Sequence, residues 1–178
     1  MSERKYVPNV IEPSFGIGRI MTGVLEHCFS VRDGDEQRTV LSFKPAVAPY
    51  KAVVLPLDAR IPREPHVSGL SSALIAAGLA CTVDDSGASI GKRYARSDEL
   101  GIPFAFTVDN RSAEDATVTL RERDSCAQLR VPIADVPSIV RSMVDEVSSW
   151  AALMSRYEVV TTGTDKAAAA VSTELPPK

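Results

Sequence analysis

The sequence predicts an α/β layer fold with a five-stranded mixed sheet, preceded by a short helix and a strand. Short apolar runs alternate with helical stretches between residues 52 and 108, a pattern typical of strands joined by crossover helices. Two stretches of alternating polarity then flank a polar turn, which predicts an antiparallel hairpin. The first three strands of this sheet are expected to be mutually parallel through right-handed crossovers.

The N-terminal part predicts one amphipathic helix over residues 15–30, because apolar side chains recur there at positions i, i+3, i+4 and i+7. The apolar stripe consists of Ile17, Ile20, Met21, Val24, Leu25, Cys28 and Phe29. Residues 32–36 predict a turn and residues 38–43 a strand. Residues 44–49 carry two prolines around small side chains, which we interpret as a joint between two structural units.

Beyond the joint, the predicted strands span residues 52–55, 79–83, 104–108, 117–123 and 128–133. One helix covers residues 67–77 and ends at Gly78, and a second begins with Ser89 as N-cap and ends near Gly101. A last helix opens at Pro137, and its stripe continues to Met154. We expect two structured segments, 1–48 and 49–158, and a disordered tail over 159–178.

Composition narrows the possible functions. The chain has 178 residues, 44% of them apolar, and a net charge of −3. That charge argues against non-specific coating of nucleic acid, which needs a broadly positive surface, but leaves a local RNA-binding patch open. No run approaches the roughly 18–20 apolar residues that cross a bilayer, and no apolar segment follows the charged N-terminus as in a signal peptide. We therefore expect no membrane association.

Cys28, Cys81 and Cys126 are odd in number and widely spaced within apolar patterns. We interpret them as buried free thiols in a reducing compartment. His27 and His66 share no ligand spacing with these cysteines, so no metal site is expected.

The stretch from Glu12 to Arg19 concentrates chemistry at the start of the first predicted helix. Gly16 and Gly18 let backbone approach a ligand closely, and free N–H groups at a helix start together with Arg19 suit a phosphate. Glu12 and Ser14 can hold a cationic or hydroxyl-seeking group beside that anion. By pattern alone, a tight strand-to-helix turn with a surface arginine is the alternative. The stretch is neither a dinucleotide fingerprint nor a P-loop.

The full string VIEPSFGIGRIM, with VRDGDEQR at 31–38, resembles the third signature motif of class II aminoacyl-tRNA synthetases. The version is similar to that of glycyl-tRNA synthetases of the eukaryote and archaeal type. Residues 84–109 and 119–125 resemble the anticodon-binding domain of the same family. The resemblance covers about Tyr6 to Tyr157, and it implies a three-layer α/β/α domain with one strand running against the others.

The resemblance also implies roles for the first motif. Arg19 matches the catalytic arginine that binds the ATP phosphates, and Gly16 and Gly18 match backbone positions along the nucleotide. Glu12 and Ser14 match residues that contact the glycine substrate. ATP with Mg²⁺ is the cofactor implied for the complete enzyme, and none is expected to bind this chain alone.

A basic surface is expected on the second segment. The hairpin places Thr119, Arg121 and Arg123 on one face, which Gln128 and Arg130 extend. The helix after Ser89 adds four further candidates: Lys92, Arg93, Tyr94 and Arg96. Arginine forks and an aromatic plane suit splayed RNA bases, and the resemblance implies contact with the anticodon loop. The alternative is a solvated charged face with Asp98, Glu99, Glu122 and Asp124 as ion-pair partners.

These observations predict the C-terminal part of a glycine-tRNA ligase that binds the anticodon region of glycine tRNA. The first and second class II motifs have no counterpart before Glu12, so we expect this chain alone to be inactive and to need the rest of the homodimeric synthetase. We expect a cytoplasmic location, with mitochondria left open. One alternative is a non-catalytic module of the same fold that serves nucleic-acid or protein assembly; a weaker one is a small-molecule-binding α/β domain.

Overall fold

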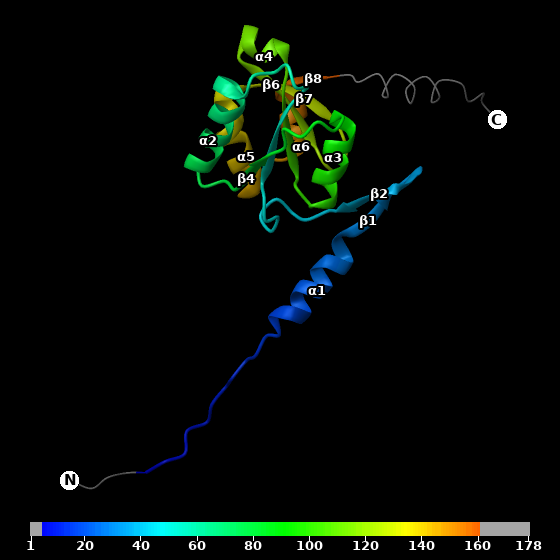
Figure 1. The fold of residues 1–178 in the computed structure, drawn as a ribbon. Coiled ribbons are helices and arrows are strands. Elements are labelled where there is room, and N and C mark those ends of the chain that lie inside the picture. The colour runs from blue at the N-terminus through cyan, green and yellow to red at the C-terminus, as the bar shows by residue number, and fades with distance from the viewer. Residues whose placement is uncertain (1–4, 161–178) are drawn as a thin grey trace, which may run out of the picture.

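The computed structural model describes residues 5–160, which form an extended N-terminal arm and a layered body (Figure 1). The arm contains a helix and a two-stranded antiparallel sheet: α1 (Ile17–Cys28), β1 (Phe29–Arg32) and β2 (Asp35–Leu41). The body holds a six-stranded sheet of order β4-β3-β5-β6-β7-β8. Its strands are β3 (Ala52–Pro56), β4 (Cys81–Val83), β5 (Phe104–Val108), β6 (Thr117–Glu122), β7 (Gln128–Pro132) and β8 (Glu158–Val159).

The body's helices are α2 (Ser68–Ala76), α3 (Ile90–Glu99), α4 (Asn110–Asp115), α5 (Val136–Val144) and α6 (Trp150–Arg156). Short irregular turns at Arg63–Val67 and Ile133–Asp135 precede α2 and α5. Gly78 follows α2 with a φ of +71°, a conformation that a glycine adopts without strain. The predicted α/β class with a mixed sheet is confirmed.

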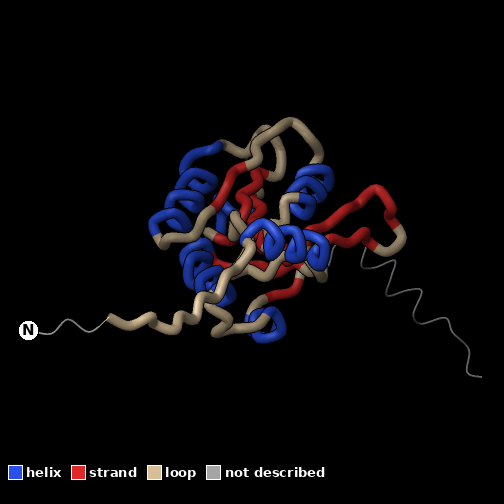
Figure 2. Tube along the Cα trace, turned by 90° about the horizontal axis from the view of Figure 1, so that it is seen from below, coloured by secondary structure: helices blue, strands red, loops and turns tan. Residues whose placement is uncertain are grey.

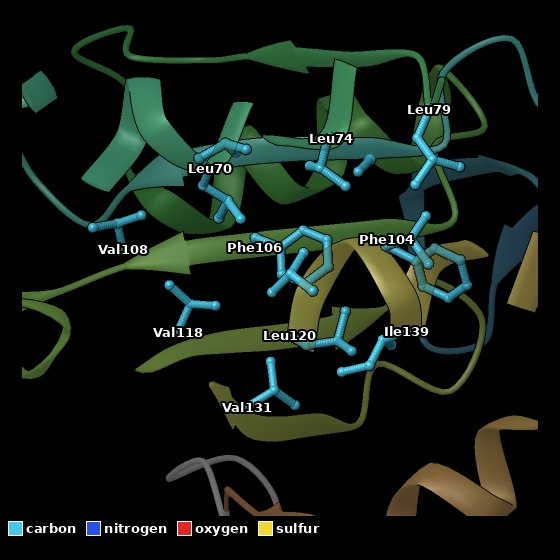
Figure 3. Close-up of a cluster of buried hydrophobic side chains, with 14 of the residues drawn as sticks. Leu70, Leu74, Leu79, Phe104, Phe106, Val108, Val118, Leu120, Val131 and Ile139 are labelled. Carbon is cyan, nitrogen blue, oxygen red and sulfur yellow. The ribbon is translucent and has the colours of Figure 1, made fainter. Parts of the chain in front are cut away.

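Helices cover both faces of the sheet (Figure 2), and β3 and β5 are therefore buried along their whole length. On one face, Leu70 and Leu74 of α2 and Ile139 of α5 pack against Phe104 and Phe106 (Figure 3). On the other face, Ile90 and Tyr94 of α3 pack against Val53 and Leu55. Burial of each large apolar side chain contributes about 1.5–3 kcal/mol.

The sheet pairing follows the expected topology with one addition. β3 pairs in parallel with both β4 and β5, and β6 and β7 form the predicted antiparallel hairpin. The expected count of five strands is wrong, because Glu158 and Val159 pair with Arg130 and Leu129 as a sixth strand. The expected tail is therefore wrong at residues 159 and 160, where Val160 N–H also donates to the Gln128 carbonyl at 2.8 Å. Residues 161–178 of that tail lie outside the described residues.

Three local expectations are corrected. The single helix expected from Pro137 to Met154 is two helices, because Glu146 adopts a left-handed φ of +55° and Val147 N–H closes onto the Ser142 carbonyl at 2.8 Å. Residues 29–32 form a strand, although Phe29 continues the apolar stripe of α1 and the helix was expected to reach residue 30. Helix α4 was not predicted; Asp109 caps it by accepting from Ser112 N–H at 3.1 Å.

Helix α1 projects away from the body and buries none of its side chains (Figure 1). The arm contacts the body through β2 and the residues beside it, which lie against α3. Within residues 5–160, no helix combines the length and the apolar character that a bilayer crossing requires. The three cysteines are free and half-buried, so the expectation of fully buried thiols is wrong.

Candidate nucleic-acid interface

Arg121 of β6 is held beneath α3 by a buried carboxylate. Its two terminal nitrogens donate to the carboxylate of Asp98 at 2.8 and 3.0 Å, and its guanidinium lies 4.7 Å from the ring centroid of Tyr94. Burial lowers the pKa of Arg121, but the hydrogen bonds and charge of Asp98 outweigh that effect and the pKa is raised. Arg121 is therefore a permanently charged part of the scaffold.

Tyr94 is packed against the same face of the sheet. Its hydroxyl lies 2.6 Å from the Thr107 hydroxyl of β5. Burial is the main reason that the pKa of Tyr94 is raised, so the phenol stays protonated. Its ring is covered by Arg121 and therefore does not present a free stacking surface on that side.

Arg123 is 2% exposed and spans the joint between arm and body. It donates to the Gly101 carbonyl at 2.9 Å and to the Phe43 carbonyl at 2.8 Å, and it pairs with Asp124 at 2.8 Å. Burial raises the pKa of Asp124, but the bonds and charge of Arg123 outweigh it and the pKa is lowered. This network fixes the backbone on both sides of the joint.

Arg93 of α3 is also buried, and it donates to the carbonyls of Pro56, Leu57 and Asp84. The interpretation of Arg93, Arg121 and Arg123 as exposed RNA contacts is therefore corrected. The alternation of the hairpin was predicted properly, and Thr119, Arg121 and Arg130 do share one face. The alternative of ion pairs with Asp98 and Asp124 is what the structure shows for Arg121 and Arg123, whereas Asp109 as the partner of Arg130 was not indicated.

Lys92 and Arg96 remain accessible on the outer side of α3. Lys92 is exposed, and Arg96 is half-exposed with an ion pair of 2.8 Å to Asp84. Burial raises the pKa of Asp84, but bonds to Ser86 and the charges of Arg96 and Arg93 outweigh it and the pKa is lowered. Arg96 also contacts Ser86 in the loop that follows β4, and a partly exposed ion pair of this kind opens at modest cost.

Asp109 was missed as a component of the polar sheet face, whereas Asp98 was among the candidate ion-pair partners named from the sequence. Asp109 accepts from Arg130 at 2.6 and 3.0 Å, and Asp98 binds both Arg121 and, at 2.9 Å, Arg32 of the arm. The Asp-x-x-Ser spacing at 109–112 is a helix-start signal that could have indicated the cap. The sequence named Asp98 as a candidate ion-pair partner, but no pattern indicated that Arg32 of the arm would share it with Arg121.

The first motif lies entirely on the arm. Glu12, Ser14, Gly16, Gly18 and Arg19 are all exposed, and no side chain caps the first turn of α1. Among residues 5–160, Arg19 forms neither an ion pair nor a side-chain hydrogen bond. The structure keeps these residues along one stretch of chain, at and before the N-terminus of α1.

Metal binding has no geometric support in the part of the chain that is described. Residues 5–160 contain no group of three or more histidine, cysteine or acidic side chains arranged to hold an ion.

Comparisons with known proteins agree with the fold and with the expected family. Residues 51–143 match the family model described as "Anticodon binding domain". The chain is similar to the glycine–tRNA ligase of Bombyx mori, with 53% identity over 152 residues that cover 85% of this chain and 21% of that protein. It is 48% identical over 142 residues to the glycine–tRNA ligase of Archaeoglobus fulgidus, covering 79% of this chain and 25% of that protein.

The chain thus spans about a fifth to a quarter of these relatives' length, in their C-terminal part. Among solved structures, prolyl-tRNA synthetase of Cryptosporidium parvum superposes with a TM-score of 0.56 at 24% identity, over 64% of this chain and 24% of that one. The RNA-binding domain of threonyl-tRNA synthetase from the same organism gives 0.52 at 23% identity, over 57% of this chain and 25% of that one. The chain belongs to the anticodon-binding domain family.

Proposed function

We propose that this chain binds the anticodon region of glycine tRNA as part of a class II glycine-tRNA ligase. The observation that carries the proposal is the family match over residues 51–143 together with 53% identity to a glycine–tRNA ligase. We propose that aminoacylation requires the homodimeric complete enzyme, because the known relatives are four to five times longer than the matched part. The division into segments 1–48 and 49–158 belongs to the same proposal, as does a cytoplasmic location.

Of the candidate RNA contacts named from the sequence, Lys92 and Arg96 are the accessible cations, at the outer side of α3. Their charges can neutralise phosphates, and the guanidinium of Arg96 can also contact base edges when it leaves Asp84. Phosphate contacts supply affinity that falls steeply with salt, whereas base contacts supply dependence on the anticodon. The proposal therefore predicts that binding depends both on salt concentration and on the anticodon sequence, and a single binding assay can measure both.

The test is filter binding of the chain to glycine tRNA and to its anticodon variants at several salt concentrations. Lys92→Ala/Arg96→Ala should weaken binding and reduce the salt slope by about 1–2. Arg111→Ala is the matched control, since Arg111 is similarly exposed and pairs with Asp115 at 3.2 Å on α4. Equal binding of all tRNAs, or an equal effect of the control, would reject this assignment.

We propose that the arm contributes to the ATP and glycine site. Arg19 and the uncapped first turn of α1 leave donors free for a phosphate, so the residues present fit that group. ATP, with Mg²⁺, supplies the activating phosphoanhydride when bound in the complete enzyme. Arg19 would hold phosphate oxygens, and Glu12 would attract the ammonium group of glycine beside Ser14.

In the complete ligase, Arg19→Ala should slow glycine-dependent pyrophosphate exchange by roughly 100-fold, the scale of losing one charge-stabilising donor. Lys44→Ala is the control, because Lys44 is an exposed cation (76%) in the joint. Unchanged exchange in Arg19→Ala would remove this role.

A further inference from the structure

Helix α3, which carries Lys92 and Arg96, is held on the body mainly by polar contacts. The side chains that α3 buries are all polar: Arg93, Ser97 and Asp98. In contrast, α2 and α5 bury only apolar side chains. Ile90 and Tyr94 of α3 are partly buried against apolar side chains of the sheet. Since hydrogen bonds and ion pairs are directional, the groups that bind the polar side chains of α3 determine where the helix lies.

The element that α3 contacts most extensively is β2 of the arm, not a strand of the sheet that it covers (Figure 1). Arg38 of β2 donates to the Gly91 carbonyl in the first turn of α3 at 3.3 Å. Arg32 of β1 donates to the Asp98 carboxylate in the last turn at 2.9 Å. Gly91 and Asp98 are separated by about two turns and therefore lie on one face of α3. The arm thus holds this face of the helix at both ends.

Arg32 also joins α3 to the turn between β6 and β7. Its terminal nitrogens donate to the carbonyls of Arg123 and Asp124 as well as to Asp98. The Arg32 side chain is 17% exposed, so water competes only weakly for these bonds. Asp98 keeps Arg121 as a counter-ion when Arg32 is removed, and a chain without the Arg32 guanidinium is therefore expected to fold.

We propose that Arg32 and Arg38 are positioning residues for RNA binding, because they hold α3 where Lys92 and Arg96 meet the tRNA. The inference rests on the proposed function and deepens it, and neither arginine of the arm has to touch RNA. Both lie before residue 51, where the match to the anticodon-binding family begins. The arm therefore contributes to RNA binding by a helix of the body.

The first measurement is filter binding of the chain to glycine tRNA at several salt concentrations. If α3 occupies its binding position for only a fraction of the time, the apparent dissociation constant rises by the inverse of that fraction. Arg32→Ala should therefore raise the dissociation constant about 10-fold, and Arg38→Ala, which removes one bond of 3.3 Å, about 3-fold. The salt slope should stay unchanged in both, because α3 makes the same phosphate contacts once it is in place.

The second measurement is hydrogen exchange of the α3 amides in the absence of RNA. Arg32→Ala should accelerate exchange in α3 but not in β5, because local opening of the helix leaves the sheet intact. Arg32→Lys should recover most of the lost affinity and protection, since an ammonium group still donates to Asp98. Arg130→Ala is the matched control: Arg130 is also buried, but its side chain bonds only to residues outside α3, which are Asp109, Thr117 and Thr119.

The inference is overturned if Arg32→Ala binds tRNA as tightly as the unchanged chain, or if Arg130→Ala accelerates exchange in α3 selectively to the same extent. A salt slope that falls as in Lys92→Ala/Arg96→Ala would also overturn it, because Arg32 would then contact a phosphate itself. Weaker binding by Lys92→Ala/Arg96→Ala beside unchanged binding by Arg32→Ala rejects this inference alone. If neither variant weakens binding, the RNA interface on α3 itself is rejected, so the two failures are distinguishable.

Discussion

Asp98 accepts hydrogen bonds from two arginines that belong to different parts of the chain. Arg121 comes from the sheet and Arg32 from the arm, and the Asp98 side chain is 2% exposed. Removing the charge leaves the buried Arg121 without its counter-ion. Asp98→Asn should therefore lower the free energy of unfolding by about 3–5 kcal/mol, measured by urea denaturation.

Asp145→Asn is the comparison for this variant. Asp145 also pairs with an arginine, Arg141 at 3.6 Å, but its side chain is 48% exposed. Water screens such a pair, so Asp145→Asn should lower the free energy of unfolding by less than about 1 kcal/mol. If the two variants lost the same stability, burial of Asp98 and its arginines would not explain their contribution to the free energy of unfolding.

The lowered pKa of Asp109 leads to a prediction of how the free energy of unfolding depends on pH. Burial raises its pKa, but the bonds and charge of Arg130 and the bonds from Ser112 outweigh this effect and lower the pKa below 3.8. Because the folded carboxylate binds a proton less readily than the unfolded one, its contribution is complete above the unfolded pKa and disappears as pH falls through the folded value. Unfolding free energy should therefore decline below about pH 4.

In Asp109→Asn, the free energy of unfolding should be lower at pH 7 and fall less steeply between pH 5 and pH 2.5 than in the unchanged protein, by denaturation at each pH. Asn110→Ala, at the neighbouring neutral position, should keep the original slope. An unchanged slope in Asp109→Asn would show that other carboxylates carry the acid response.

At the scale of elements, Gly101 fits the end of α3 against the segment after β2. Its φ is +73°, and a Cβ there would lie 2.3 Å from Phe43 Cδ2 and 3.0 Å from the Leu41 carbonyl oxygen. Gly101→Ala should lower the free energy of unfolding by about 1–3 kcal/mol through crowding, with additional backbone strain. Hydrogen exchange of the β2 amides should accelerate, because the arm can no longer seat on the body.

Gly91→Ala provides the control within the same helix. Gly91 has a usual backbone conformation and open space around its added Cβ, so alanine should be neutral or stabilise α3 by up to about 1 kcal/mol. Equal destabilisation by both substitutions would contradict the assigned packing of Gly101 against Phe43.

The body's strands could be predicted because their signals are local. The uniformly apolar 104–108 is a strand buried on both faces, and the alternation after Thr117 gives the hairpin. The break between α5 and α6 could not be predicted, since an apolar stripe continues across it and a glutamate occupies the left-handed position. β8 was missed because two residues become a strand only by pairing with β7.

The candidate site was less predictable than the fold for a related reason. Alternation correctly placed Arg121 on the polar face, but burial of a charge depends on partners that approach from other elements. Asp98 is distant in sequence from both its arginines, and Arg93 bonds to carbonyls that no pattern indicates. The sequence therefore identified the arginine-rich elements, and tertiary contacts decided which arginines are buried and which remain accessible.

At the scale of the whole molecule, the arm presents apolar surface that the described residues do not cover. Ile17 and Met21 lie one turn apart on α1 and are 80% and 61% exposed. Contiguous apolar surface of this kind favours association in water. The chain alone should therefore self-associate, and Ile17→Lys/Met21→Lys should reduce that association while changing unfolding free energy by less than about 0.5 kcal/mol.

Sedimentation velocity over a range of protein concentrations measures this effect. Ile75→Lys/Val147→Lys is the matched control, because these residues are 60% and 81% exposed but lie on the body, on different elements. The control adds the same charge and should leave the concentration dependence unchanged, since scattered apolar side chains do not form an adhesive patch. If both pairs reduced association equally, added charge would explain the result, and α1 would have no special role in it.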